Sequence, residues 1–252
     1  MKFRYFIEVS YRGTRYAGFQ VQDNAVTVQE EVEKALAVFL RKKVELTGSS
    51  RTDTGVHASQ NYFHMDVEEE ISGGAAYNIN ALLPPDIAVN SIKKVREAAH
   101  CRFDALSRKY RYTVYARKNP FLIDRAYYFP YTLDMGLMSQ AAVALMEYSD
   151  FTSFAKRNSQ VKTFNCTISE SRWSMQEGSS CYEVRANRFL RGMVRGLTGT
   201  MLQVGRKKIS MEQFRQIIEG RDSSKVDFSV PGYGLCLEQV EFAAGYFEKE
   251  EA

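Results

Sequence analysis

Alternation of large apolar side chains with polar ones is the feature that most limits how this chain can fold. Residues 3–11 read FRYFIEVSY, and residues 108–117 read RKYRYTVYAR. In both runs apolar side chains recur at every second position, which is the pattern of a β-strand with one buried face. The buried faces comprise Phe3, Tyr5, Ile7, Val9 and Tyr11 in the first run, and Tyr110, Tyr112, Val114 and Ala116 in the second. Both runs therefore predict strands that pack one face on a core.

Helical patterns are fewer and do not alternate regularly with the strands. Residues 27–43 combine a Thr27–Glu30 capping box with helical apolar spacing, and residues 211–220 predict a helix that ends at Gly220. Further helices are predicted at 73–83, 133–150 and 187–205, and further strands at 44–46, 61–67, 87–95, 163–176, 180–188 and 234–242. This order predicts an α+β fold. We divide it into an N-terminal half, 1–104, and a C-terminal half, 105–252.

Composition excludes several classes of protein. The 252 residues contain no run of 18 apolar residues, so no transmembrane helix is predicted, and the N-terminus has no apolar signal core. The four cysteines, at positions 101, 166, 181 and 236, form no C-x-x-C pair, and the three histidines have no metal-ligand spacing. We therefore expect a cytosolic protein with reduced thiols and no metal site.

Basic residues are concentrated in two segments, although the net charge is only +4. Residues 99–125 contain seven basic and two acidic side chains, and residues 183–208 contain seven basic side chains and one acid. Segregated positive charge favours a polyanionic partner such as a nucleic acid. The alternative is that these are ordinary solvated faces that happen to be basic.

The second basic segment carries a distinctive helical pattern. On a helical wheel over 187–205, Arg188, Arg191 and Arg195 fall within about 60° of one another, opposite an apolar face. Arginine offers a planar fork that fits phosphates and carboxylates. We expect one guanidinium-lined face, with the glycines at 192, 196 and 199 allowing close approach to the backbone. An ordinary exposed helix face is the alternative.

A short polar loop, LTGSSRTDTGVHASQ (46–60), lies between two predicted strands and contains Arg51, Asp53 and His57. Alone, Arg51 and Asp53 are also compatible with an Asx turn and a surface ion pair. Loops that connect strands are common places for functional residues, and arginines near a tyrosine-rich strand are suited to stacking exposed bases.

The segment SSRTDTGVHA (49–58) resembles the signature of the tRNA pseudouridine synthase A family. Other segments are similar to family blocks in the same order, so the resemblance covers essentially the whole chain. These segments are 11–22, 27–36, 83–89, 102–112, 150–154, 186–205 and 234–242. Three residues depart from the family pattern, namely Arg12, Ser50 and Thr54.

The resemblance implies two similar α+β halves, whose sheets join side by side around a central active-site cleft, and usually a homodimer. It implies isomerisation of uridine to pseudouridine at positions 38, 39 and 40 of the tRNA anticodon stem-loop, with no cofactor and no metal. Two alternatives remain: a divergent paralogue that modifies another RNA site, and a tRNA-binding protein without catalytic activity.

The resemblance also implies roles for individual residues. Asp53 matches the catalytic aspartate, Tyr110 the active-site tyrosine, and Arg195 the basic partner of the aspartate. Side chains expected to bind the RNA are those of Arg51, His57, Arg102, Tyr110, Arg188 and Arg191. His57 is expected to orient the loop by hydrogen bonding, with general acid catalysis as the alternative.

Overall fold

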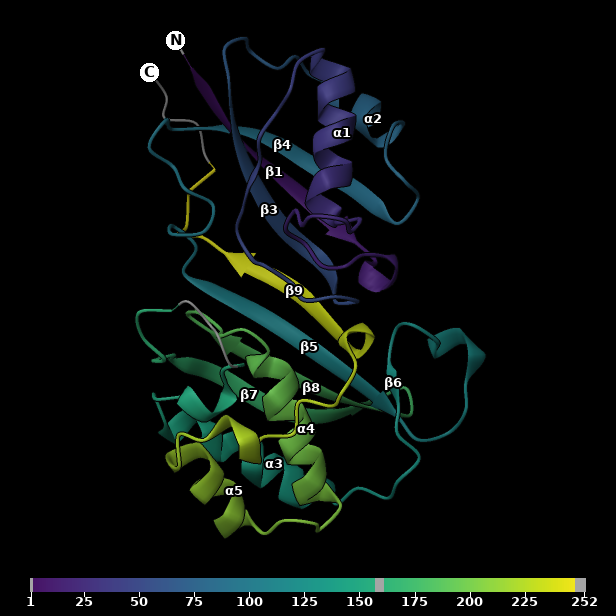
Figure 1. Ribbon diagram of the computed structural model, residues 1–252, viewed down its shortest axis with the longest axis vertical. Coiled ribbons are helices and arrows are strands. Elements are labelled where there is room, and N and C mark those ends of the chain that lie inside the picture. The colour runs from purple at the N-terminus through teal and green to yellow at the C-terminus, as the bar shows by residue number, and fades with distance from the viewer. Residues whose placement is uncertain (1, 157–160, 248–252) are drawn as a thin grey trace. The chain divides into compact units, whose positions relative to one another are not determined.

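The structure is a computed structural model that describes residues 2–156 and 161–247, and it has the predicted α+β architecture (Figure 1). The chain forms two compact units. The first comprises Met1–Leu106 and Leu237–Ala252, and the second comprises Ser107–Cys236. The chain thus leaves the first unit once and returns to it near its C-terminal end. Among the described residues, no helix is both long and apolar enough to cross a membrane.

The first unit is an antiparallel sheet with two helices. Its elements are β1 (Phe3–Tyr11), η1 (Gly13–Arg15), α1 (Val28–Leu40), β2 (Thr47–Gly48), β3 (His57–Val67), α2 (Ala75–Asn80), β4 (Ile87–Val95) and the part of β9 (Leu235–Glu241) that begins at Leu237. The strand order is β4-β1-β3-β9, and β2 pairs with β3. Helices α1 and α2 lie over one face of this sheet (Figure 1).

Local sequence explains these elements. Tyr5, Ile7 and Val9 are buried on the predicted face of β1. The N-terminus of α1 is capped as predicted, because Thr27 Oγ1 accepts the backbone N–H of Glu30 at 3.3 Å. A left-handed residue, Arg41 with φ of 54°, follows the last turn of α1.

The second unit is another sheet with helices on one face (Figure 1). Its strands are β5 (Ser107–Tyr115), β6 (Tyr127–Tyr128), β7 (Ile168–Gln176) and β8 (Ser179–Ala186), and its helices are α3 (Met135–Ala144), α4 (Met193–Gly205) and α5 (Met211–Glu219). Single-turn helices are η2 (Pro120–Leu122), η3 (Leu145–Glu147), η4 (Thr152–Phe154), η5 (Ser223–Lys225) and η6 (Gly232–Gly234). Strand β8 pairs antiparallel with β5 and β7, and β6 is parallel to β5.

Several predicted boundaries are wrong. Strand β3 begins at His57 and not at residue 61, α2 spans only Ala75–Asn80, and α3 ends at Ala144. The predicted strand at 44–46 is not formed, and Thr47–Gly48 pairs with β3 instead. The strand predicted from 163 begins at Ile168. The helix predicted from 187 begins at Met193, because Gly192 adopts a left-handed φ of 74° at its N-cap.

The segment before α4 is a loop stabilised by one side chain. Asn187 Oδ1 accepts the backbone N–H groups of Thr167 and Arg188, both at 2.8 Å. These bonds offer the backbone an alternative to helix hydrogen bonding. Arg188 and Arg191 therefore precede α4, and the predicted helical face of three arginines is not formed.

Candidate active site

Asp53 lies in a loop, residues 49–56, that connects β2 to β3 in the first unit. Asp53 is half-buried and Arg51 is exposed. The loop backbone is bonded to the turn that follows β1: Phe19 N donates to Thr52 O at 3.1 Å, and Gly55 N donates to Tyr16 O at 3.4 Å. The position of Asp53 is thus fixed by a second segment of the same unit.

Close packing between the two segments requires glycine. A Cβ added to Gly13 would lie 1.9 Å from the carbonyl oxygen of Val56, closer than any real contact permits. Gly18 has φ of 123°, and a Cβ there would lie 3.1 Å from Thr52 O. The segments 11–22 and 49–58, which the sequence singled out separately, therefore form one structure.

Two residues that sequence reasoning missed hold the start of this loop. Asn61 is fully buried in β3, and its Nδ2 donates to Ser50 O at 2.8 Å and to Tyr11 Oη at 3.2 Å. The Tyr11 hydroxyl in turn bonds to Thr52 Oγ1 at 2.8 Å. The available signal was an amide at the start of the predicted strand NYFHMDV, because a polar group that becomes buried requires a partner.

His57 connects the Asp53 loop to the turn after β1 by a hydrogen bond. It is buried at the start of β3, and its Nδ1 accepts the backbone N–H of Gly13 at 3.0 Å. This bond assigns an unprotonated Nδ1 to the neutral ring and fixes the ring against the turn after β1.

An ionic clamp holds the other side of the same turn. Arg15 donates to both carboxylate oxygens of Asp86 at 2.6 and 2.8 Å, and the Tyr16 hydroxyl donates to Asp86 Oδ1 at 2.6 Å. The Arg15 hydrogen bond holds the pKa of Asp86 below its ordinary value, although burial acts in the opposite direction. The turn that supports Asp53 is therefore anchored to the start of β4.

Tyr110 and Arg195 belong to the second unit. Tyr110 is buried in β5, and its ring meets Phe189 edge-on with centroids 5.1 Å apart. Arg195 is half-buried in α4. Its Nε donates to Val230 O at 2.8 Å, and its Nη2 donates to Phe228 O at 3.4 Å. Backbone carbonyls thus position this guanidinium.

Two of the glycines predicted to allow a close approach, Gly196 and Gly199, serve this internal contact. A Cβ at Gly199 would lie 2.2 Å from Asp227 O, and one at Gly196 would lie 2.8 Å from the ring of Phe228. The close approach predicted from these glycines is made by residues 226–228 of the same unit. That packing brings the carbonyls of Phe228 and Val230 to Arg195.

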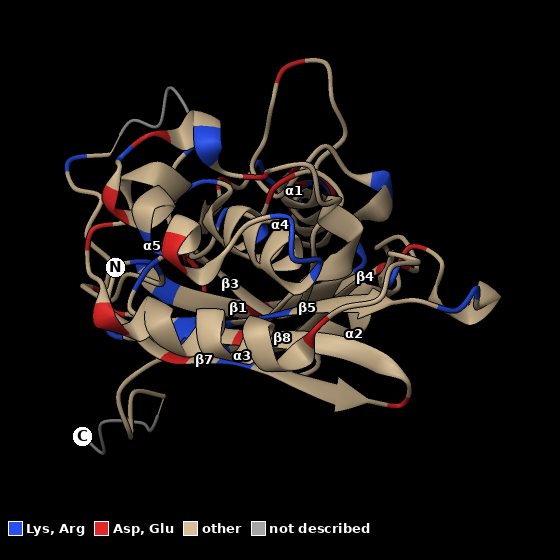
Figure 2. Ribbon diagram, turned by 90° about the horizontal axis from the view of Figure 1, so that it is seen from below, with Lys and Arg blue, Asp and Glu red and all other residues tan. Residues whose placement is uncertain are grey.

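The two basic segments are partly used inside the second unit. Arg108 is buried and donates to Asn187 O at 3.1 Å, and Lys109 pairs with Glu183 at 2.8 Å. Both basic and acidic stretches occur along the ribbon (Figure 2). The exposed basic side chains of the segments are Arg102, Arg117, Lys118, Arg125, Arg191, Lys207 and Lys208, and Arg188 is half-buried.

A different part of the first unit gathers three potential metal ligands. One ligand atom each from His64, His100 and Cys101 lies within 4.8 Å of the others. Burial, His100 and Arg4 lower the pKa of His64 to about 4, and burial lowers the pKa of His100. Both imidazoles are therefore neutral at pH 7.

Nearly the whole chain is similar to known proteins. The model of a family described as tRNA pseudouridine synthase matches residues 7–104 and 141–243. The chain is 45% identical over 251 residues to tRNA pseudouridine synthase A of Bacteroides thetaiotaomicron, covering 98% of this chain and 93% of the relative. It is 43% identical over 250 residues to tRNA pseudouridine synthase A of Parabacteroides distasonis, covering 98% and 99%.

A more distant relative is similar over nearly as much of the chain. Identity to tRNA pseudouridine synthase A of Staphylococcus saprophyticus is 38% over 240 residues, covering 94% of this chain and 90% of the relative. The matched residues include both segments that build the Asp53 loop, together with Arg195. The chain therefore belongs to the tRNA pseudouridine synthase family.

Proposed function

We propose that this protein isomerises uridine to pseudouridine in tRNA, at positions 38, 39 and 40 of the anticodon stem-loop. The observation that carries the proposal is near full-length similarity to proteins named tRNA pseudouridine synthase A, in a chain whose Asp53 loop is fixed by dedicated contacts. The reaction breaks the C1′–N1 bond, turns the base and forms a C1′–C5 bond. N1 gains a proton and C5 loses one, so no redox partner is required.

Asp53 is the proposed nucleophile. A carboxylate can form a covalent intermediate that divides this reaction into two steps. The neighbouring hydroxyls are poor alternatives, because they lack an activating base: those of Ser49 and Ser50 are buried without a hydrogen-bond partner among the described residues, and Thr52 Oγ1 bonds to Tyr11. Asp53 is therefore the group in the loop best suited to attack.

Arg195 is the proposed charge partner of Asp53. A carboxylate that is shielded from water by a bound base would become neutral unless a cation lay beside it. The Arg195 guanidinium donates to Val230 O and Phe228 O. A guanidinium positioned by carbonyls is well suited to keep an adjacent carboxylate ionised.

Tyr110 is the proposed stacking platform and proton-transfer group at C5. The target base is stacked in RNA, so it must be flipped out at a cost of a few kcal/mol. Arg51 and His57 would hold the flipped nucleotide and the loop. Arg102, Arg188 and Arg191 would contact the RNA backbone, and Arg102 and Arg191 are exposed.

We further propose that the protein acts as a homodimer in the cytoplasm, without a cofactor. Sedimentation of the purified chain at micromolar concentrations tests the dimer, and a purely monomeric species would contradict it.

Mapping of pseudouridine on defined RNA tests the function. Unmodified tRNA transcripts are incubated with purified protein, and pseudouridine is located by carbodiimide treatment and primer extension. We expect stops at positions 38 to 40 that are absent with the Asp53→Asn variant. Stops elsewhere would indicate a divergent paralogue, and tRNA binding without any stop would indicate a non-catalytic binding protein.

A further inference from the structure

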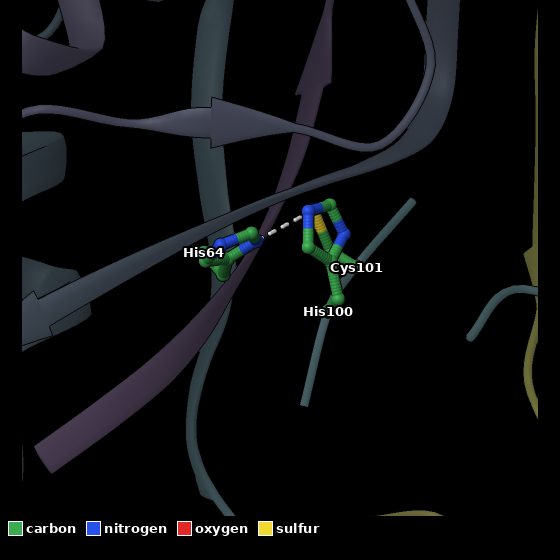
Figure 3. A group of neighbouring side chains, drawn as sticks. All are labelled: His64, His100 and Cys101. Carbon is green, nitrogen blue, oxygen red and sulfur yellow. Dashed lines mark hydrogen bonds between the residues drawn. The ribbon is translucent and has the colours of Figure 1, made fainter. Parts of the chain in front are cut away.

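His64, His100 and Cys101 form a compact cluster on the first unit (Figure 3). His64 projects from β3, and the other two residues come from the loop that follows β4. The chain has only three histidines, and two of them are in this cluster. The sequence predicted no metal site because residue 64 is distant from residues 100 and 101 in the chain; folding brings their side chains together.

The spacing is close to that of a zinc site. Zinc–sulfur and zinc–nitrogen bonds of about 2.3 and 2.1 Å at a tetrahedral angle separate the two ligand atoms by about 3.6 Å. His64 Nδ1 and Cys101 Sγ are 3.2 Å apart. All three ligand atoms lie within 4.8 Å of one another, so no pair has to close by more than about 1.4 Å on binding.

Most of the cluster is held in place without a metal. His64 is buried in a paired strand, and the Cys101 thiol is fully buried and donates to Thr47 O at 3.2 Å. The loop closes on itself, because His100 N donates to Asp104 Oδ2 and Asp104 N donates to His100 O, both at 3.0 Å. Little ordering of the backbone is therefore needed for binding.

Local charge does not prevent a cation from entering. Arg4 is the nearby positive group, but it is bound through two 2.6 Å contacts to Asp66 and donates to Ala99 O. Its charge is largely balanced by this carboxylate. Phe103 is exposed and packs against His100 with ring centroids 4.2 Å apart, so His100 lies on the solvent side of the cluster.

We propose that His64, His100 and Cys101 bind a divalent metal ion of zinc type as a structural site. The thiol loses its proton to solvent as the metal–sulfur bond forms, and each imidazole contributes a nitrogen lone pair. Solvent takes the fourth tetrahedral position. Thiolate and imidazole together favour zinc over magnesium or calcium.

His100 is the weakest of the three ligands. Its Nδ1 accepts the backbone N–H groups of Arg102 at 3.2 Å and Phe103 at 3.4 Å, which places the proton of the neutral ring on Nε2. Binding through Nε2 moves that proton to Nδ1 and gives up these two long bonds. Loss of His100 should therefore weaken binding less than loss of Cys101.

The site would fasten the loop after β4 to β3 and lies away from the proposed chemistry. His64 is seven residues beyond His57 along β3, a distance of roughly 23 Å in an extended strand. The metal would stabilise the first unit without touching the reacting base. A structural metal at this site is therefore compatible with a reaction that uses no metal.

Cobalt and zinc titrations of the untagged, chelator-treated full-length protein test the site. We expect a thiolate-to-cobalt charge-transfer band, its loss when zinc is added, and a melting temperature that rises with zinc concentration. Cys101→Ser should remove the band and weaken zinc binding roughly tenfold or more, whereas His100→Gln should keep a weaker band. The matched control is Cys181→Ser, a buried cysteine of the second unit, which should bind as the unaltered chain does.

X-ray absorption on the zinc-loaded unaltered protein gives an answer even if Cys101→Ser does not fold. We expect one sulfur neighbour at about 2.3 Å with nitrogen or oxygen neighbours at about 2.1 Å. No zinc binding, zinc bound without sulfur, or a cobalt band that survives in folded Cys101→Ser would each overturn the proposal.

Discussion

Gly13 and His57 show at the scale of single residues how tightly the Asp53 loop is held. A side chain at Gly13 would collide with Val56 O, and the Gly13 N–H is accepted by His57 Nδ1. The hydrogen bond from Gly13 to His57 thus fixes the turn after β1 against the loop, and the absence of a Cβ at Gly13 allows the close approach. An error of about 1 Å in such a site costs a large factor in rate, so these contacts bear on activity as well as stability.

The first prediction concerns His57. In His57→Asn the amide oxygen can replace Nδ1 as acceptor, so the free energy of unfolding and the single-turnover rate should stay close to the original values. His57→Ala leaves the buried Gly13 N–H unpaired and should lower the free energy of unfolding by about 1–3 kcal/mol. Urea unfolding and single-turnover assays measure both. An Asn variant as inactive as a folded Ala variant would instead assign proton transfer to His57.

The second prediction separates stacking from proton transfer at Tyr110. Tyr110→Phe keeps the ring and its edge-on contact with Phe189, so tRNA affinity should be retained. Loss of the hydroxyl should lower the single-turnover rate by roughly two to four orders of magnitude. Tyr115→Phe, on the same strand but the opposite face, is the matched control and should leave the rate unchanged. An unaltered rate in Tyr110→Phe would reduce Tyr110 to a stacking platform.

At the scale of elements, α4 illustrates what periodicity can and cannot predict. Its apolar residues Met193, Leu197 and Met201 are buried as the wheel predicted. The start of the helix was predicted wrongly. Gly192 has a positive φ that interrupts helical geometry, and a helical wheel carries no information on backbone dihedral angles. Local patterns located β1, α1 and β4 well, since burial of one face imposes a strict period on each.

The third prediction follows from the contact between α4 and residues 226–230. Gly199→Ala places a Cβ against the Asp227 carbonyl, so the segment must shift and carry the carbonyls of Phe228 and Val230 away from Arg195. We expect the free energy of unfolding to fall by about 3 kcal/mol and the single-turnover rate to fall with it. Gly136→Ala, at an exposed position of α3, is the control and should alter stability by less than about 1 kcal/mol. Normal stability and rate in Gly199→Ala would contradict this role for the glycine.

The contacts that build the candidate site could not be predicted from local sequence. Tyr11 and Thr52 are 41 residues apart, and Asn61 reaches back 11 residues to Ser50. Such bonds depend on the register of β1 against β3, which sequence alone does not give. The resemblance named Asp53, Tyr110 and Arg195 by position, but it did not say which side chains hold them.

At the scale of the whole molecule, the return of the chain to the first unit at Leu237 is a further long-range feature. No local pattern indicates which sheet a C-terminal strand will join. By contrast, the α+β class followed from the order of strands and helices alone, because it depends on the kinds of element and not on their pairing.

The fourth prediction is the acid sensitivity of unfolding. The pKa of Asp86 is lower in the folded protein than in the unfolded chain, mainly because of the Arg15 hydrogen bond. The folded state therefore binds fewer protons near this group, so its stabilisation is present above about pH 4 and is lost as pH falls through the lowered pKa. Urea unfolding between about pH 2 and 6 should show a smaller pH dependence for Asp86→Asn than for the original chain. Identical pH dependence in both would contradict the clamp.

The central claim is that the Asp53 carboxylate performs the chemistry, and one paired measurement tests it most directly. Asp53→Asn keeps the size of the side chain and removes its charge. On one unmodified tRNA transcript, gel-shift affinity and single-turnover pseudouridine formation are measured for both proteins. We predict no detectable pseudouridine with the variant, at an affinity that is unchanged or slightly higher because one negative charge near the RNA is gone. Activity within about tenfold of the original, a barrier change of only ~1.4 kcal/mol, would show that Asp53 shapes the loop and that another group is catalytic.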